Sequence, residues 1–251
     1  MTGMSRVIVA TTLTTFAMDQ EFTWSAWLIN ADAMRNSAPD GIEFFAAIEV
    51  DARGLAPFEP LLERLYGLND YEHDLWWTFN LDDGRTTVST KNRLRHITTG
   101  QNLCMDRAAS GDASHLLFVA ADCEPPPDVL TKLRQPREHI VAAHSPTYCL
   151  PSQPIPDHEG VPDQYPLHVA VTPDTLCFSA ACVLFDRVAF RALRWRWDKD
   201  TNMTDDPCMQ HDAWYNHGWP VYVRPHCITR HHPESIPPIE YRGHDLRVVR
   251  E

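Results

Sequence analysis

The sequence lacks the features that define several classes of protein. Its seven cysteines include no Cys-x-x-Cys pair, and their odd number and irregular spacing argue against a disulfide framework or a thiolate zinc site. No stretch approaches the roughly 20 apolar residues of a membrane span. Residues 1–13 lack the cleavage-site pattern of a secretory signal peptide. These absences favour a reducing, cytoplasmic setting.

Basic residues are also in deficit. The chain has 22 Lys and Arg against 34 Asp and Glu, which gives a net charge of −12. Affinity for phosphate backbones depends on clustered Lys and Arg, so this balance does not favour a general nucleic-acid binder. With 43% hydrophobic residues, the 251-residue chain has the composition of a globular protein rather than a disordered one.

Short apolar runs alternate with helical patterns in the first half of the chain. The predicted strands are residues 5–10, 42–50, 74–79, 115–121 and 140–143, and the predicted helices are residues 21–36, 57–66, 98–110 and 126–133. This alternation predicts an α/β fold with a wound, mostly parallel sheet flanked by helices. Ligands of such sheets bind outside the carboxyl ends of the strands. The residues expected there are Thr11, Thr12, Glu49, Asp51 and Asp122.

A proline-rich stretch separates two halves of one predicted domain. Residues 145–173 contain seven prolines, which argue against regular structure and predict a long loop. Strands are predicted beyond it at residues 182–185 and 221–223, with helices at 187–193 and 208–217. We treat the chain as a single domain, and the expected division is a donor half over about 1–144, an acceptor half with the catalytic residues over about 168–232, and a tail over 233–251.

Two carboxylates follow the strand predicted at residues 115–121. Asp122 and Glu124 lie two positions apart and precede a proline-led helix, so both can approach one cation. Mg²⁺ typically takes one or two protein carboxylates together with substrate phosphates. The structural alternative is that Asp122 only caps the turn.

This stretch resembles the Asp-x-Asp segment of GT-A glycosyltransferases of the family-2-like type. The first Asp of that motif falls on Ala120, which leaves Asp122 at the second, metal-binding position, with Ala121 between them. The resemblance implies a nucleoside-diphosphate sugar as donor and Mn²⁺ or Mg²⁺ as cofactor. It leaves open whether Glu124 is a ligand in a shifted pair or only supports the site. The preceding helix is similar to one that lies beneath the donor, which implies that Gln101 and Asn102 lie near the diphosphate.

A second resemblance covers residues 177–193 and 204–223. Asp205 and Asp206 match the acidic pair that opens a helix in the family, and Gly218 matches the end of that helix. An inverting transfer needs a carboxylate to take the proton of the acceptor hydroxyl, and Asp206 is favoured over Asp205 for this role. The alternative is that both acids only cap the helix, where negative charge is favoured.

Further candidates flank these motifs. The resemblance implies an additional metal ligand at His231 or His232, and Trp195 or Trp197 is a candidate for stacking on the acceptor sugar or base. The acceptor stays open among a carbohydrate, a small molecule and a hydroxymethylated DNA base, for which the basic residues between 85 and 95 are one argument.

Three other functions remain as alternatives. A sugar nucleotidyltransferase is disfavoured because the loop after the first strand, TTLTTFAM, has neither a glycine nor a basic residue. A hydrolase is disfavoured because the histidines show neither an HxH nor an HExxH spacing. A catalytically silent binder of nucleotide sugars stays possible because Ala120 interrupts the Asp-x-Asp motif.

Overall fold

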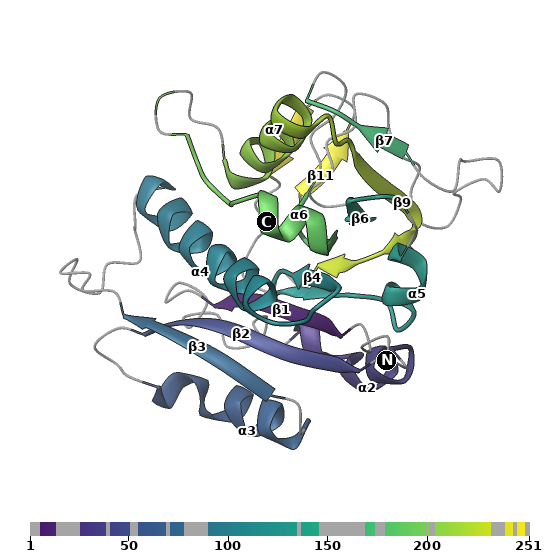
Figure 1. Ribbon diagram of the computed structural model, residues 1–251. Coiled ribbons are helices and arrows are strands. Elements are labelled where there is room, and N and C mark those ends of the chain that lie inside the picture. The colour runs from purple at the N-terminus through teal and green to yellow at the C-terminus, as the bar shows by residue number, and fades with distance from the viewer. Residues whose placement is uncertain are drawn as a thin grey trace.

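An eight-stranded sheet forms the centre of the computed structural model of the chain (Figure 1), with the strand order β3-β2-β1-β4-β8-β6-β9-β7. The bounds of these strands are β1 Val7–Leu13, β2 Ile42–Val50, β3 Tyr71–Trp77, β4 His115–Val119, β6 Ile140–His144, β7 Val169–Val171, β8 Cys182–Asp186 and β9 Val221–Ile228. Six strands run in one direction, and only β7 and β8 are antiparallel to their neighbours. The predicted wound, mostly parallel sheet is therefore confirmed.

The description covers the parts of the chain that carry these elements. They are residues 6–13, 26–38, 41–50, 55–68, 71–77, 90–134, 137–145, 169–173, 179–198, 200, 204–231, 239–242 and 245–248. Within them, no helix is long and apolar enough to cross a membrane.

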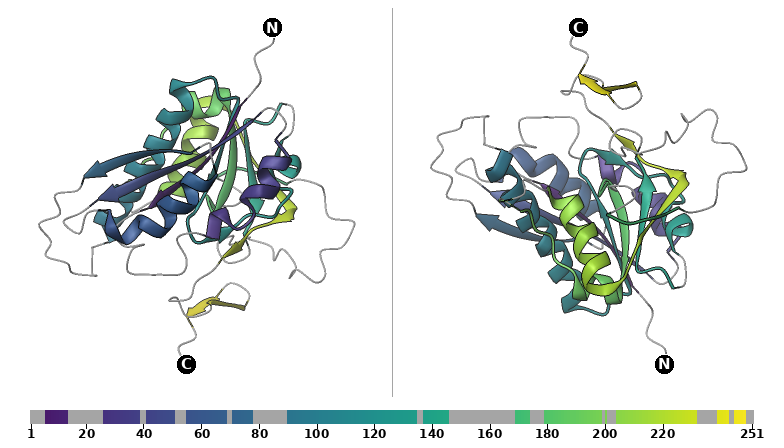
Figure 2. Two further views of the ribbon diagram at one scale, coloured as in Figure 1. Left: turned by 90° about the horizontal axis from the view of Figure 1, so that it is seen from below. Right: turned by 90° about the horizontal axis from the view of Figure 1, so that it is seen from above.

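Helices pack on both faces of the sheet. Buried side chains of one face meet those of α4 (Thr90–Ser110), α6 (Arg187–Ala192) and α7 (Asp205–His217). The opposite face meets the elements η1 (Ala26–Leu28), α2 (Ala31–Asn36), η2 (Ala56–Phe58), α3 (Glu59–Gly67) and α5 (Val129–Leu133). Figure 2 shows the sheet between these two helical layers. The result is a three-layer α/β/α arrangement, as the alternating pattern predicted.

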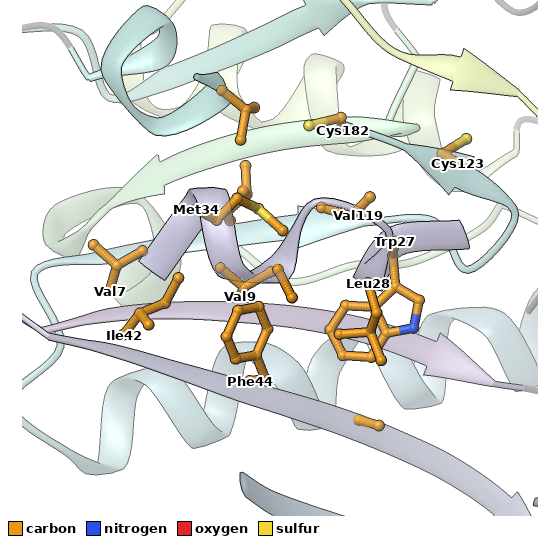
Figure 3. Packing of buried hydrophobic residues seen from close by; sticks show 14 of the residues in the cluster. Val7, Val9, Trp27, Leu28, Met34, Ile42, Phe44, Val119, Cys123 and Cys182 are labelled. Atoms are coloured by element: carbon orange, nitrogen blue, oxygen red, sulfur yellow. The ribbon is translucent and has the colours of Figure 1, made fainter. Parts of the chain in front are cut away.

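The central strands are buried on both faces, which explains their continuous apolar runs. All nine residues of β2 are buried. Along β1, Val7 and Val9 belong to one core while Ile8 and Ala10 belong to the other, because successive side chains of a strand point to opposite faces. On the η1 side, Trp27 packs at a tilt against Phe44 of β2, with ring centroids 6.3 Å apart (Figure 3).

Several element predictions need correction. The helix predicted over 21–36 is the short η1 followed by α2, with residues 14–25 outside the described part. Helix α4 begins at Thr90, eight residues before the predicted start. The proline-rich stretch contains β7, whose three residues pair with β9. The tail contains two paired strands, β11 (Ile239–Arg242) and β12 (Asp245–Val248), for which no pattern was recognised.

Strand β8 joins the two halves of the chain in one sheet. It lies antiparallel between β4 and β6, with Val119 opposite Cys182 and Ile140 opposite Phe185. At its end, Asp186 caps α6, because its Oδ1 accepts the Ala189 N–H at 2.8 Å. The turn before β8 therefore lies at the carboxyl end of β4, where the ligand edge of the sheet was predicted.

The cap of α6 gives a first prediction. Asp186→Ala should lower the free energy of unfolding by about 1 kcal/mol, because alanine cannot accept the Ala189 N–H. Asp186→Asn keeps an accepting oxygen and should lose less. Urea unfolding of both variants measures the difference. Wild-type stability in Asp186→Ala would contradict this role of the cap.

Candidate functional site

The parallel strands β1, β2 and β4 end at one edge of the sheet. In register, Ala10 lies opposite Phe118, and Leu13 lies opposite Ile48. Thr11 and Thr12 therefore continue β1 beside the turn that follows β4, where Asp122 lies. This arrangement places the backbone of the three segments at the edge that the sequence predicted.

The Asp122 turn is held by main-chain hydrogen bonds. The Ala120 N–H donates to Ala181 O, and the Cys123 N–H donates to Ala120 O, both at 2.9 Å. Asp122 is partly exposed within this turn and accepts a weak hydrogen bond from Cys123 Sγ at 3.6 Å. Burial and, after it, the charge of Asp122 raise the pKa of the Cys123 thiol, so the thiol stays protonated and donates.

The next two residues form β5 (Cys123–Glu124), which pairs antiparallel with β10 (Arg230–His231). Cys123 lies opposite His231 in this pairing. The backbone of the candidate ligand His231 is thus adjacent to the Asp122 turn, 109 residues away along the chain, while His232 lies outside the described residues. Glu124 accepts a hydrogen bond from Asn30 Nδ2 at 3.3 Å, and the same amide donates to Pro125 O at 2.8 Å. No pattern in the sequence marked Asn30 as a residue of this site.

The acidic pair opens α7 directly after Thr204. The Ala180 N–H donates to Asp206 Oδ2 at 3.1 Å, and Gln101 Nε2 donates to Asp205 Oδ2 at 2.8 Å. Because Ala181 O accepts the Ala120 N–H, the dipeptide Ala180–Ala181 connects the acidic pair to the Asp122 turn. The two sequence motifs therefore meet at the same edge of the sheet.

The environment of Asp206 disfavours its charge. The residue as a whole is partly exposed, but its carboxylate is desolvated. Burial and, after it, the charge of Asp205 raise the pKa of Asp206 well above its ordinary value, against a smaller opposing contribution from the Ala180 N–H. Perturbed carboxyl groups of this kind cluster at functional sites.

The amides of α4 make contacts other than those expected. Gln101 binds Asp205, and Asn102 binds the main chain of Trp195 twice, through Nδ2 to the carbonyl and through Oδ1 to the N–H, each at 2.8 Å. Both amides thus hold the acceptor half of the chain, whereas the resemblance had placed them at the donor diphosphate.

Trp195 is a core residue in this structure. It is 2% exposed, and its ring packs against Phe118 and Phe185 with centroids 5.8 and 5.9 Å away. No ring face is accessible for stacking on a sugar, so this part of the acceptor prediction needs correction. Trp197 is partly exposed.

The strand-end residues of the donor half lie in different environments. Glu49 is fully buried, and its carboxylate is hydrogen-bonded to the ring of His96 of α4, so it contacts protein. Thr12 Oγ1 lies 3.9 Å from Cys104 Sγ, and Cys104 donates to Thr11 O at 3.4 Å. The Thr11 hydroxyl is buried and has no hydrogen-bond partner in the described structure. Asp51 lies outside the described residues.

The residues at this edge suit a hard divalent cation that takes part of its ligands from a diphosphate. The described residues contain no group of three His, Cys, Asp or Glu side chains arranged around a metal. Asp122 is a partly exposed carboxylate, and Mg²⁺ sites often use only one or two carboxylates beside phosphate oxygens. The backbone of His231 lies beside the same turn. The set is thus compatible with such a cation but does not form a complete protein cage.

Comparisons with known proteins identify the fold. No family model and no curated protein matches the chain. The structure is similar to that of the mannosyltransferase PcManGT from Pyrobaculum calidifontis in complex with GDP-Man and Mn²⁺, with a TM-score of 0.54 and 14% identity over 92% of this chain and 57% of that chain. The fold is of the GT-A type.

A second GT-A structure agrees. GalNAc-T7 with UDP, GalNAc and Mn²⁺ has a TM-score of 0.53 and 10% identity over 90% of this chain and 43% of that chain. The chain thus spans about half the length of these two proteins. An inositol-1-phosphate CTP transferase from T. maritima has a TM-score of only 0.43, which supports no argument for the nucleotidyltransferase alternative.

The raised pKa of Asp206 gives a prediction for stability. The folded protein binds the Asp206 proton more tightly than the unfolded chain does, so this residue stabilises the fold below pH about 4 and the contribution is lost as the pH rises through the folded-state pKa. Asp206→Asn keeps an oxygen for the Ala180 N–H and removes the disfavoured charge. It should therefore melt at a higher temperature than wild type at pH 7, and the gap should close near pH 4.

Asp212 is the matched control on the same helix. Burial opposes the ionisation of Asp212, but hydrogen bonds from Arg196 and His211 outweigh it and lower the pKa of Asp212. Asp212→Asn should therefore lose stability at pH 7. Thermal unfolding between pH 4 and 8 measures both variants. A lower melting temperature for Asp206→Asn than for wild type at pH 7 would show that the Asp206 charge does not destabilise the fold.

Proposed function

We propose that the chain is a metal-dependent glycosyltransferase that moves a sugar from a nucleoside-diphosphate donor to an acceptor hydroxyl. The observation that carries the proposal is the connection through Ala180 and Ala181, which brings the acidic pair of α7 beside the Asp122 turn. An inverting transfer needs a general base on one side of the reacting carbon and charge compensation for the leaving diphosphate on the other. The two carboxylate sites at this edge of the GT-A fold are suited to these two tasks.

Asp122 is the proposed metal ligand, with His231 or His232 as a further ligand and Glu124 in support. When bound, Mn²⁺ or Mg²⁺ would neutralise charge on the diphosphate and make it a better leaving group. The Cys123 thiol donates to Asp122 Oδ1 and helps to hold the carboxylate in the turn. Asn30 holds Glu124 and Pro125, which keeps the segment after the turn against the η1–α2 junction.

Asp206 is the proposed general base. Its Oδ2 is held by the Ala180 N–H, so Oδ1 is the oxygen proposed to take the proton of the acceptor hydroxyl. A carboxylate whose pKa is raised is a stronger base than an ordinary aspartate, and a positioned base contributes about 10²–10⁴-fold to rate. Asp206 acts as a base only above its own pKa, so the transfer rate should fall as the pH drops below that pKa.

The acceptor class is open in this proposal. A carbohydrate, a small molecule and a hydroxymethylated DNA base are the three candidates to screen. Arg194 and Arg196 do not favour DNA over the other acceptors, because Arg194 is paired with Asp106 and Arg196 with Asp212.

Removal of the metal ligand gives the next prediction. Asp122→Asn should abolish metal-dependent binding of nucleoside diphosphate, because a neutral amide is a poor ligand for a hard cation. Calorimetric titration with nucleoside diphosphate in the presence of Mn²⁺, with and without EDTA, measures the affinity for the diphosphate. The same titration of Glu124→Gln decides whether Glu124 is a ligand or only a supporting residue. If Asp122→Asn binds nucleoside diphosphate with the affinity of wild type, both with and without EDTA, Asp122 is not the metal ligand.

Substitution of the acids tests the catalytic role. Asp206→Asn should reduce transfer by at least about 100-fold while donor affinity stays within about twofold of wild type, because Asn cannot accept a proton. Asp205→Asn is the matched variant and should reduce transfer less. Hydrolysis of nucleotide sugars with Mn²⁺ but without acceptor, followed by an acceptor screen, supplies the assay. Near wild-type rates in both variants would exclude Asp205 and Asp206 as the general base. A wild-type protein that binds nucleotide sugar but transfers none would favour the catalytically silent binder.

A further inference from the structure

The amide of Gln101 bridges two parts of the molecule that are 104 residues apart in sequence. Gln101 is 2% exposed on α4, and its Nε2 donates to Asp205 Oδ2 at 2.8 Å. Its neighbour Asn102 holds the main chain of Trp195, which precedes α7. This stretch of α4 therefore contacts both the first turn of α7 and the segment that leads into it.

The orientation of the Gln101 amide follows from the chemistry of its partner. An ionised carboxylate only accepts hydrogen bonds, so the NH₂ group must face Asp205. The amide oxygen, Gln101 Oε1, is then buried without a hydrogen-bond partner in the described structure. A buried unsatisfied carbonyl is unfavourable and calls for an explanation. If the side chain at this position only filled space, methionine or leucine would do so without leaving a buried oxygen unpaired.

The consequence for Asp206 follows from helix geometry. Adjacent helix residues point about 100° apart, because an α-helix has 3.6 residues per turn. A contact that holds Asp205 toward α4 therefore turns Asp206 toward a different neighbour, which is the Ala180 N–H. The N–H of Gln101 also stabilises the charge of Asp205, so that two adjacent acids can be accommodated on the first turn of α7.

We propose that Gln101 is a positioning residue of the acidic pair, which fixes Asp205 so that Asp206 is presented to the acceptor hydroxyl. The inference rests on the proposed function for the role of Asp206, and it replaces the donor-diphosphate role expected for Gln101 from the sequence. The two roles predict different kinetic changes. A positioning residue affects turnover at saturating donor, whereas a donor ligand affects the donor KM.

The deciding variant is Gln101→Met, which keeps the volume of the side chain and removes the N–H. It should lower kcat about 10-fold or more, the scale of a lost hydrogen bond to a charged group, with the donor KM within about twofold of wild type. Gln101→Glu places a carboxylate against Asp205 and should lower kcat at least as much. An unchanged kcat in Gln101→Met, or a loss that appears mainly as a higher donor KM, would overturn the proposal.

Thr98→Val is the matched control on the same helix. Thr98 is also buried, but its hydroxyl donates to Arg95 O within its own helix, so the variant should retain wild-type kcat and KM. A second readout does not need activity. The side-chain ¹³C signal of Asp205 should shift in Gln101→Met and stay unchanged in Thr98→Val, and an unshifted signal in Gln101→Met would overturn the contact itself. If wild type transfers no sugar while the signal shifts, the proposed function fails and the contact between Gln101 and Asp205 stands.

Discussion

Two main-chain N–H groups hold the candidate site together. One belongs to Ala120 and donates to Ala181 O, and the other belongs to Ala180 and donates to Asp206 Oδ2. The first ties the turn after β4 to the start of β8, and the second ties the start of β8 to the first turn of α7. Because both donors belong to the backbone, alanine suffices at these positions. The antiparallel insertion of β8 between β4 and β6 is what puts them in place.

The same arrangement creates an energetic conflict. Desolvation and the neighbouring carboxylate of Asp205 disfavour the charge of Asp206 and raise its pKa. The hydrogen bonds that offset this include the Ala180 N–H to Asp206 and the Gln101 amide to Asp205. Natural sequences tolerate such locally unfavourable groups mainly at functional sites, where chemistry requires them. Asp206 thus differs from ordinary helix-capping acids, which are solvated and stabilising.

Much of the architecture was accessible from local patterns. The continuous apolar run at β2 and the helical periods between strands predicted the wound sheet, and the acids after β4 and at the start of α7 were recognised as a pair of sites. The errors fall where local signals are weak. Strand β7 has only three residues within a proline-rich stretch. The sequence over 21–36 shows no signal that would have predicted the two short elements η1 and α2 in place of one helix. Short elements are specified by the neighbours they pair with rather than by their own periodicity.

The sequence by itself determined the α/β class, the strand-end position of Asp122 and the acidic start of α7, because periodicity, strand ends and helix starts are encoded within about a turn or a strand of sequence. Only the tertiary structure decided which groups those side chains meet. Gln101 and Asn102 contact the acceptor half, Trp195 lies in the core, and Glu49 is paired with His96. These partners are 47 to 104 residues apart along the chain. A polar residue carries no local signal of a distant partner, since the partner is selected by the packing of the sheet and its helices.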